Sequence, residues 1–280
     1  MSKFIELLLK DLNVYPGYPD FRKRGVVSNM AYDAWMMDGR PSGLVGGLYD
    51  HSGHLRGVRQ GRAVIDDGTI RFWNRDFMPS CHGSYPRDSN GRPVHPYAED
   101  ILKAGLGIEG PGAYWQYGPN LCADPIVLGV SNDGYLKTII IERDDTGQIA
   151  LPGGHLNANE DPWLAAVREF REETTIEISP DDLLHFERLL RDIVPDTRTT
   201  INAWPETTVC LFVLKTGVID TYRPVGSDDA AEARCVLVDD ALYEGIQPAH
   251  EEFVRRAVEV FEEQFEVMVH VNGFVDANQD

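Results

Sequence analysis

The sequence lacks several features that would assign it to a common class of protein. Its four cysteines (Cys81, Cys122, Cys210 and Cys235) are far apart and form no CxxC pair, so neither a zinc ribbon nor a redox motif is indicated. No apolar run approaches the roughly 20 residues that a membrane span needs. The start "MSKFIELLLKDLNVYP" has no signal-peptide pattern and is typical of a natural N-terminus with a small amphipathic helix. We therefore expect a soluble, reduced, cytoplasmic protein without a membrane partner.

Basic residues are also scarce. The chain has 26 Lys and Arg against 45 Asp and Glu, which gives a formal net charge of −19. A surface this acidic argues against non-specific binding to nucleic acid or to an anionic membrane. It does not exclude an anionic small substrate, because a divalent metal and a few arginines can reverse the field locally.

The 280 residues suffice for one domain with a smaller companion. Residues 1–120 are rich in turn formers, and "GRAVIDDGTIRFWNRDF" predicts a hairpin with Asp67 and Gly68 at its bend, so we expect an irregular, β-rich N-terminal domain. Residues 121–280 alternate strand patterns such as "LKTIIIE" with two helices, "PWLAAVREFREET" and "QPAHEEFVRRAVEVFEEQF". The second helix carries Val254, Ala257, Val258, Phe261 and Phe265 on one face. Strands mixed with helices indicate an α/β layer sandwich.

The segment "LPGGHLNANEDPWLAAVREFREETT" crowds like charges beside a glycine turn. Asp161 followed by Pro162 predicts a helix start, and an apolar stripe should face the core. The stripe comprises Trp163, Ala166, Val167 and Phe170. Glu169, Glu172 and Glu173 have the i, i+3, i+4 spacing that points side chains together.

Such clustering destabilises a bare helix, but it is favourable if the carboxylates share divalent cations such as Mg²⁺. Arg168 can pair with Glu172 one turn on or reach back to Glu160. The alternative interpretation is a solvated charged face.

The full spacing resembles the Nudix box, Gx5Ex7REUxEExGU. The matching residues are Gly154, Glu160, Arg168, Glu169, Phe170, Glu172, Glu173 and Ile176. Thr175 departs from the pattern, because the box has a glycine there that shapes the turn after the helix. The resemblance implies a Nudix α/β/α sandwich with a mixed sheet, and hydrolysis of a nucleoside diphosphate linked to another moiety.

The same resemblance implies a set of site residues. Glu169, Glu172 and Glu173, with the backbone carbonyl near Gly153, would bind Mg²⁺ or Mn²⁺. Glu160 and Arg168 would be mainly structural. The general base would be an acidic residue of the later loop (Asp228, Asp229 or Glu232) or a glutamate of the box itself; the loop can equally be a solvated acidic turn.

Two flanking segments, "YGPNLCADPIV" and "TRTTINAWPET", resemble the ADP-ribose pyrophosphatases of the mitochondrial type. That branch is related to the ADP-ribose-binding module of melastatin-type channels. The resemblance implies hydrolysis of ADP-ribose to AMP and ribose 5-phosphate by a monomer whose N-terminal domain covers the cleft. Two alternatives stay open: a sensor that binds ADP-ribose without cleaving it, and a Nudix hydrolase of another nucleoside diphosphate derivative.

Four residues match substrate contacts of that branch: Asn120, Asp196, Arg198 and His250. Ile201 departs from it, because relatives often carry Asp there. Each of the four also has a structural interpretation: a turn cap for Asn120, a surface ion pair for Asp196 with Arg198, and a helix-start position for His250. Trp204 is expected in the core rather than stacked on adenine.

Overall fold

The computed structural model describes most of the second half of the chain and parts of the first. The described residues are 2–14, 47–49, 55–58, 65–66, 69–70, 80–81, 83–89, 91–104, 114, 117–144, 146–157, 160–196, 198–265, 268–270 and 273–275. They divide into two compact units. Unit 1 comprises Met1–Leu121 with Asp192–Glu206, and unit 2 comprises Cys122–Arg191 with Thr207–Asp280.

The segment Asp192–Glu206 belongs to unit 1, although it lies within the expected second domain, 121–280. Its backbone explains the grouping. The His95 amide donates to the Ile201 carbonyl (2.7 Å), and the Gly118 amide donates to the Asn202 carbonyl (2.7 Å). The Asn202 side chain donates in turn to the carbonyl of Pro93 (2.8 Å). These bonds join the segment to residues that precede the expected boundary.

Among the described residues, unit 1 contains two helices and two small hairpins. The elements are α1 (Lys3–Val14), β1 (Gly47–Tyr49), β2 (Leu55–Val58), β3 (Ile65–Asp66), β4 (Thr69–Ile70) and α3 (Ala98–Lys103). The amphipathic N-terminal helix is confirmed, because Phe4 and Ile5 are buried while Glu6 is exposed. The hairpin is confirmed by the antiparallel pairing of β3 with β4; its bend lies outside the described residues. The β-rich character of the whole N-terminal region stays a prediction.

The core of unit 1 forms around Trp204, which is fully buried as expected. Ile201, where an acidic residue would suit the resemblance, packs into the same apolar cluster. Beside it, Glu206 is buried and accepts hydrogen bonds from the Ser80 hydroxyl (2.5 Å) and the Trp204 indole (3.0 Å). A buried carboxylate needs such donors to offset its desolvation, and these bonds supply them.

Unit 2 is built on a seven-stranded sheet in which β11, β6, β5, β10 and β9 follow one another, with β7 on β6 and β8 on β5. The strands are β5 (Gly118–Val130), β6 (Leu136–Arg143), β7 (Ile149–Ala150), β8 (Gly154–His155), β9 (Leu183–Ile193), β10 (Ala203–Leu214) and β11 (Ala230–Leu237). The first residues of β5 and β10 and the last two of β9 belong to unit 1. The strand expected at "LKTIIIE" is thereby confirmed as β6.

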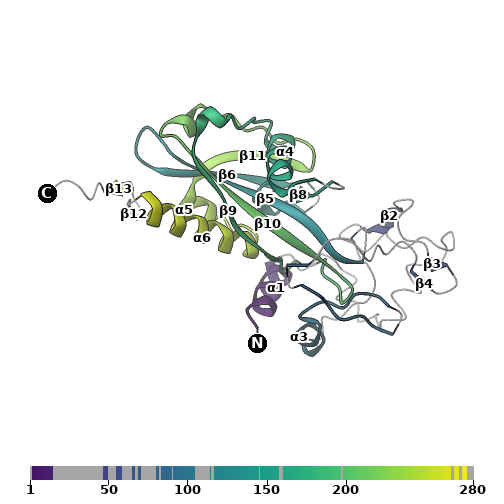
Figure 1. Ribbon diagram of the computed structural model, residues 1–280. Coiled ribbons are helices and arrows are strands. Elements are labelled where there is room, and N and C mark those ends of the chain that lie inside the picture. The colour runs from purple at the N-terminus through teal and green to yellow at the C-terminus, as the bar shows by residue number, and fades with distance from the viewer. Residues whose placement is uncertain are drawn as a thin grey trace. The chain divides into compact units, whose positions relative to one another are not determined.

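Helices cover both faces of this sheet, as Figure 1 shows for α4 (Pro162–Thr174) and α6 (Pro248–Phe265). The other elements are η2 (Pro180–Asp182), η3 (Val218–Thr221), α5 (Val238–Tyr243), β12 (Met268–His270) and β13 (Gly273–Val275). The buried apolar face of α6 comprises Phe253, Val254, Ala257, Val260 and Phe261. Val258 and Phe265, expected on that face, are only half-buried. In the part of the chain that the structure describes, every helix is too short or too polar to cross a bilayer.

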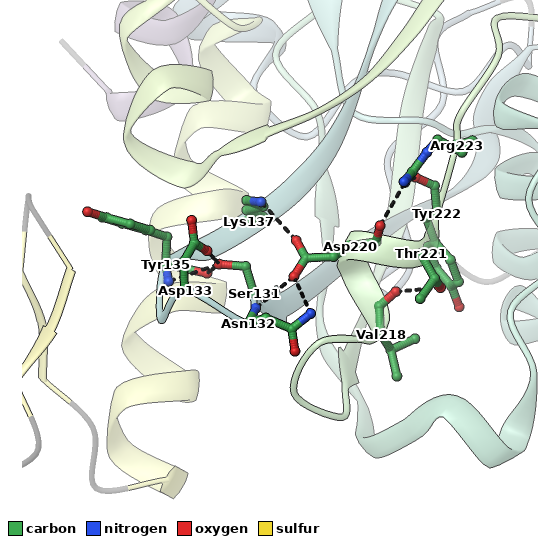
Figure 2. A network of polar contacts seen from close by, with 10 residues as sticks. All are labelled: Ser131, Asn132, Asp133, Tyr135, Lys137, Val218, Asp220, Thr221, Tyr222 and Arg223. Carbon is green, nitrogen blue, oxygen red and sulfur yellow. Dashed lines mark hydrogen bonds and ion pairs between the residues drawn. The ribbon is translucent and has the colours of Figure 1, made fainter.

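The turn between β5 and β6 is tied to η3 by one aspartate (Figure 2). Asp220 accepts from the backbone and side-chain amides of Asn132 (2.7 and 3.0 Å) and from the ammonium group of Lys137 (2.9 Å). These bonds, the Asn132 backbone first, lower the pKa of Asp220. The contacts join residues 88 positions apart in the sequence and brace the sheet.

Candidate active site

Helix α4 begins and ends where the sequence predicts. Asp161 adopts an extended conformation and its side chain accepts from the backbone amide of Trp163 (2.8 Å), while Pro162 occupies the first helical position. The helix ends at Thr175, which has a φ of 61° and donates its backbone amide to the Arg171 carbonyl. A left-handed residue is the common way to end a helix, and glycine normally fills that position. Thr175 therefore takes the conformation of the missing glycine despite its branched side chain.

The two faces of α4 have different environments. Ala165, Ala166 and Phe170 are buried in the core cluster that the helix forms with β5, β6 and β10. Trp163 and Val167 pack against the same cluster from its edge. The predicted stripe is confirmed, and Ala165 extends it. The remaining face presents Arg168 and the three glutamates.

Arg168 is the centre of this charged face. Its Nε and Nη2 bind both carboxylate oxygens of Glu160 (2.8 and 2.7 Å). Its Nη1 donates to Glu169 Oε1 (2.7 Å) and to Glu172 Oε2 (2.8 Å), and its Nη2 also reaches the carbonyl of His155 (3.0 Å). Both pairings expected for Arg168, with Glu160 and with Glu172, are present together. The one guanidinium compensates three carboxylates.

Glu160 and Arg168 shift each other's pKa in the directions that favour the ion pair. The hydrogen bonds from Arg168 lower the pKa of Glu160, and those to Glu160 raise the pKa of Arg168. Glu160 also accepts the backbone amide of Asn157 (2.7 Å). Because bidentate arginine–carboxylate pairs fix geometry, this pair holds the loop before α4 against the helix.

Glu169 and Glu173 are buried, in contrast to Glu172, whose side chain is 36% exposed. Burial raises the pKa of Glu169, against the lowering effect of Arg168. Burial also raises the pKa of Glu173 to about 8, although its Oε2 accepts the backbone amide of Gly153 (2.8 Å). A buried carboxyl whose charge is uncompensated takes up a proton, so Glu173 is neutral at neutral pH in the absence of a cation.

The glycine turn before β8 fits closely against these carboxylates. A Cβ at Gly154 would lie 2.7 Å from the carboxyl carbon of Glu169. A Cβ at Gly153, whose φ is +153°, would lie 2.2 Å from Oδ1 of Asp124 and 2.8 Å from the carbonyl oxygen of Ala123. Gly153 therefore requires glycine, because a side chain would also meet the backbone of Ala123, whereas a side chain at Gly154 would displace the carboxyl end of Glu169.

The donor set suits a hard divalent cation. Oxygens of Glu169 and Glu172 already share one cationic nitrogen, Nη1 of Arg168, so they can meet around a positive charge. In this arrangement, no three His, Cys, Asp or Glu side chains of the described residues are grouped tightly enough to hold a metal ion. The reason is visible in the contacts: Arg168 holds two of the glutamates, and Gly153 holds Glu173. The expectation that the three carboxylates bind metal stays a prediction.

Three of the four expected substrate residues lie in unit 1. Asp196 and Arg198 are brought together, with Nη2 of Arg198 at 2.6 Å from Oδ2 of Asp196, and the guanidinium lies 5.5 Å from the centre of the Tyr114 ring. Asn120 is buried and donates to the carbonyl of Gly118 (3.1 Å). Tyr114 had no signal in the sequence that would have singled it out.

His250 lies in unit 2, in the first turn of α6. Its Nδ1 accepts the backbone amide of Leu151 (2.9 Å), and its Nε2 is 4.0 Å from Oδ2 of Asp124. Asp124 is buried on β5 and was not among the expected site residues. Leu151 opens the segment that leads to the glycine turn. The structure thus connects His250 with the turn beside the acidic helix.

The acidic loop before β11 is exposed. Asp228 and Asp229 face solvent in this loop, and Asp228 has a φ of 54°. Glu232, expected in the same loop, is exposed on β11 itself, where it pairs with Glu142 of β6. The loop runs beside the end of α4, where the amide of Ser227 donates to the carbonyl of Glu173 (3.2 Å). The charge of Asp229 contributes to the raised pKa of Glu173. The loop is therefore near enough to influence the acidic helix, and its role as a base stays a prediction.

With this geometry established, comparison with known proteins gives the family. Residues 127–257 match the model of the NUDIX domain. This part of the chain is a NUDIX domain. It includes α4, the glycine turn, His250 and most of the sheet, and it confirms the expected α/β fold class with a mixed sheet.

Three relatives of the NUDIX-containing chain fit the expected branch. Nudix hydrolase 6 of Caenorhabditis elegans is 32% identical over 58% of this chain and 62% of its own length. The mitochondrial ADP-ribose pyrophosphatase of Rattus norvegicus is 29% identical over 61% of this chain and 54% of its own. A transient receptor potential cation channel subfamily M member-like 2 of Nematostella vectensis is 30% identical over 55% of this chain and 11% of its own length. The chain thus spans less than two thirds of each relative.

Solved structures also match. A MutT/nudix family protein from Enterococcus faecalis shares 22% identity, with a TM-score of 0.42 over 61% of this chain and 71% of its own. The resemblance found in the sequence, to the mitochondrial type of ADP-ribose pyrophosphatase and to the related channels, is confirmed by the three relatives.

Proposed function

We propose that the protein hydrolyses the pyrophosphate of ADP-ribose, giving AMP and ribose 5-phosphate with a divalent metal, Mg²⁺ or Mn²⁺. The observation that carries the proposal is the α4 cluster, in which Arg168 gathers Glu160, Glu169 and Glu172. The choice of ADP-ribose is supported by the name of the rat relative. Water adds to one phosphorus and the P–O–P bond breaks, so no oxidant or second substrate is needed.

The metal would be held by Glu169, Glu172 and Glu173 with the backbone carbonyl of Gly153. When bound, it would neutralise the diphosphate and lower the pKa of a water molecule. The chain supplies the supporting geometry. Glu160 keeps Arg168 in place through two bonds, so the guanidinium can release Nη1 from Glu169 and Glu172 without leaving the site.

The family resemblance assigns the orientation of the substrate to Asn120, Asp196, Arg198 and His250. Asp196 accepts three side-chain hydrogen bonds from the guanidinium of Arg198 and so fixes its orientation. A guanidinium held in this way would bind a phosphate or ribose of the substrate. We assign Asn120 to the same role from the family resemblance. Asp228, Asp229 and Glu232 remain the candidates for the base, together with the glutamates of α4.

The test incubates the protein with Mg²⁺ or Mn²⁺ and a panel of nucleoside diphosphate derivatives. The release of AMP is measured by chromatography. The wild type is expected to prefer ADP-ribose. Glu172→Gln should lower kcat by about 100-fold or more, because an anionic metal ligand contributes several kcal/mol to the transition state. Glu177→Gln is the matched control, since Glu177 is exposed beyond the end of α4, and its rate should stay within about twofold of wild type.

Each other result has a defined meaning. Binding of ADP-ribose without any AMP, with either metal, would refute hydrolysis and favour a sensor. Faster cleavage of a different nucleoside diphosphate derivative would keep the reaction and replace the substrate. Equal losses in the Glu172 and Glu177 variants would remove the acidic helix from the mechanism.

A further inference from the structure

The histidine at the start of α6 contacts the backbone of the segment that forms the glycine turn. The Leu151 amide points its hydrogen at Nδ1 of His250 (2.9 Å). Leu151 is buried, with 2% of its surface exposed, so water does not replace this acceptor. A buried amide without an acceptor is costly. The position of Leu151 therefore depends on the imidazole.

This contact fixes the protonation of the ring. A backbone amide can only donate, so Nδ1 must be the unprotonated nitrogen and the neutral ring carries its hydrogen on Nε2. That N–H side is 4.0 Å from Oδ2 of Asp124. The imidazole thus stands between a backbone donor on one side and a carboxylate on the other.

Asp124 and the turn are themselves in close contact. Its Oδ1 occupies the space where a side chain at Gly153 would begin, 2.2 Å from that Cβ position. Gly153 in turn donates its amide to Glu173 (2.8 Å). The turn therefore connects two helices. Leu151 at its start contacts His250 of α6, and Gly153 contacts Glu173 of α4. Asp124 of β5 lies against Gly153.

We propose that His250 is a positioning residue that sets the Leu151–Gly154 turn through Nδ1, and so places the Gly153 carbonyl and Glu173 for the metal. The sequence-based expectation was different: His250 would contact the substrate, near its terminal ribose or adenosine. The role proposed here uses Nδ1, the nitrogen that already accepts the Leu151 amide. It rests on the proposed function for the reaction and for Gly153 and Glu173 as metal ligands, whereas the contacts of His250 are present without substrate.

Two substitutions distinguish support of the turn from contact with substrate. The side-chain amide of asparagine places an acceptor near the position of Nδ1, and that of glutamine places one near the position of Nε2. If Nδ1 supports the turn, His250→Asn should bind Mn²⁺ like the wild type. His250→Gln should weaken Mn²⁺ binding by about 10- to 100-fold, the range found when a residue supporting a metal ligand is lost. Mn²⁺ affinity is measured by electron paramagnetic resonance, without ADP-ribose. His185→Asn, on β9, is the matched control.

Kinetics add a second readout with ADP-ribose as substrate. At saturating Mn²⁺ the glutamine variant should lose kcat while its KM changes little, because the turn supports the metal and not the ribose. Since the Mn²⁺ titration needs no substrate, failure of the wild type to cleave ADP-ribose would remove the proposed function and leave this test intact.

The proposal is overturned if glutamine preserves Mn²⁺ affinity and asparagine does not, or if the two variants behave alike. It is also overturned if both leave Mn²⁺ affinity unchanged and only raise KM. Should a variant fail to fold, ¹⁵N chemical shifts of the imidazole in the wild type decide the point, because Nδ1 must appear unprotonated and Nε2 protonated at pH 8.

Discussion

Glu173→Gln tests how far the ionisation of one buried carboxyl on α4 lowers the free energy of unfolding. The folded protein holds the pKa of this carboxyl at about 8, mainly through burial, against 4.5 in the ordinary state. The charges around it are Glu169 and Asp229, which raise the pKa, and Arg143, which lowers it. Glutamine mimics the protonated carboxyl in shape but cannot ionise.

The sign follows from proton binding. Between pH 4.5 and about 8 the folded protein keeps the proton and the unfolded chain has lost it, so the free energy of unfolding falls as the pH rises. At about 1.4 kcal/mol for each tenfold change in proton affinity, the fall reaches at most about 5 kcal/mol. Below pH 4.5 both states are protonated and the effect of this group disappears.

The assay is urea unfolding in EDTA at pH 5 and pH 8. At pH 8, Glu173→Gln should exceed the wild type in stability by up to about 5 kcal/mol, and at pH 5 the two proteins should differ far less. The control variant Glu177→Gln should follow the wild type at both values. Saturating Mn²⁺ should reverse the order, because the metal stabilises the ionised carboxylate. Equal pH dependence in the wild type and Glu173→Gln would refute the argument.

Three further substitutions test neighbouring features. Thr175→Gly should stabilise the protein by about 0.5–1 kcal/mol in urea unfolding, because the left-handed conformation costs a branched residue about 1–2 kcal/mol; a loss of stability would contradict this account of the helix end. Gly154→Ala should weaken Mn²⁺ binding by about tenfold or more, since its Cβ would meet the Glu169 carboxyl at 2.7 Å, and unchanged affinity would place that carboxyl elsewhere. Glu160→Gln should cost about 1–3 kcal/mol in thermal unfolding, because Arg168 loses a two-point partner; no loss would show that the loop is held by other contacts.

Local patterns made the acidic helix predictable. The start of α4 follows from Asp161 and Pro162. The two expected partners of Arg168 are close in sequence, because Glu172 is four residues away and Glu160 is eight. The strands of unit 2 were likewise predictable, because their apolar runs are bounded by turn residues. The core position of Trp204 belongs with these successes.

Contacts between distant segments could not be predicted in the same way. His250 and Leu151 are 99 positions apart, and nothing in the helix-start pattern around His250 indicates which backbone amide it accepts. Asp124 is a single acidic residue in an apolar strand, which carries no motif. The same holds for Glu206, whose donors include Ser80, 126 positions away. Such pairs depend on how the elements pack.

The crowding of glutamates on α4 is explained by two different compensations in the absence of metal. Arg168 balances Glu160, Glu169 and Glu172 through direct bonds to each. Glu173 is out of reach of that guanidinium's bonds and is instead neutralised by a proton, because burial outweighs the amide of Gly153. Under the proposed function, a divalent cation would displace one proton and draw two carboxylates from Nη1, while Glu160 keeps the arginine in place. Repulsion among the glutamates is thus relieved in two ways, by the ion pairs with Arg168 and by the proton on Glu173. The proposed metal ion would replace that proton and the bonds from Nη1.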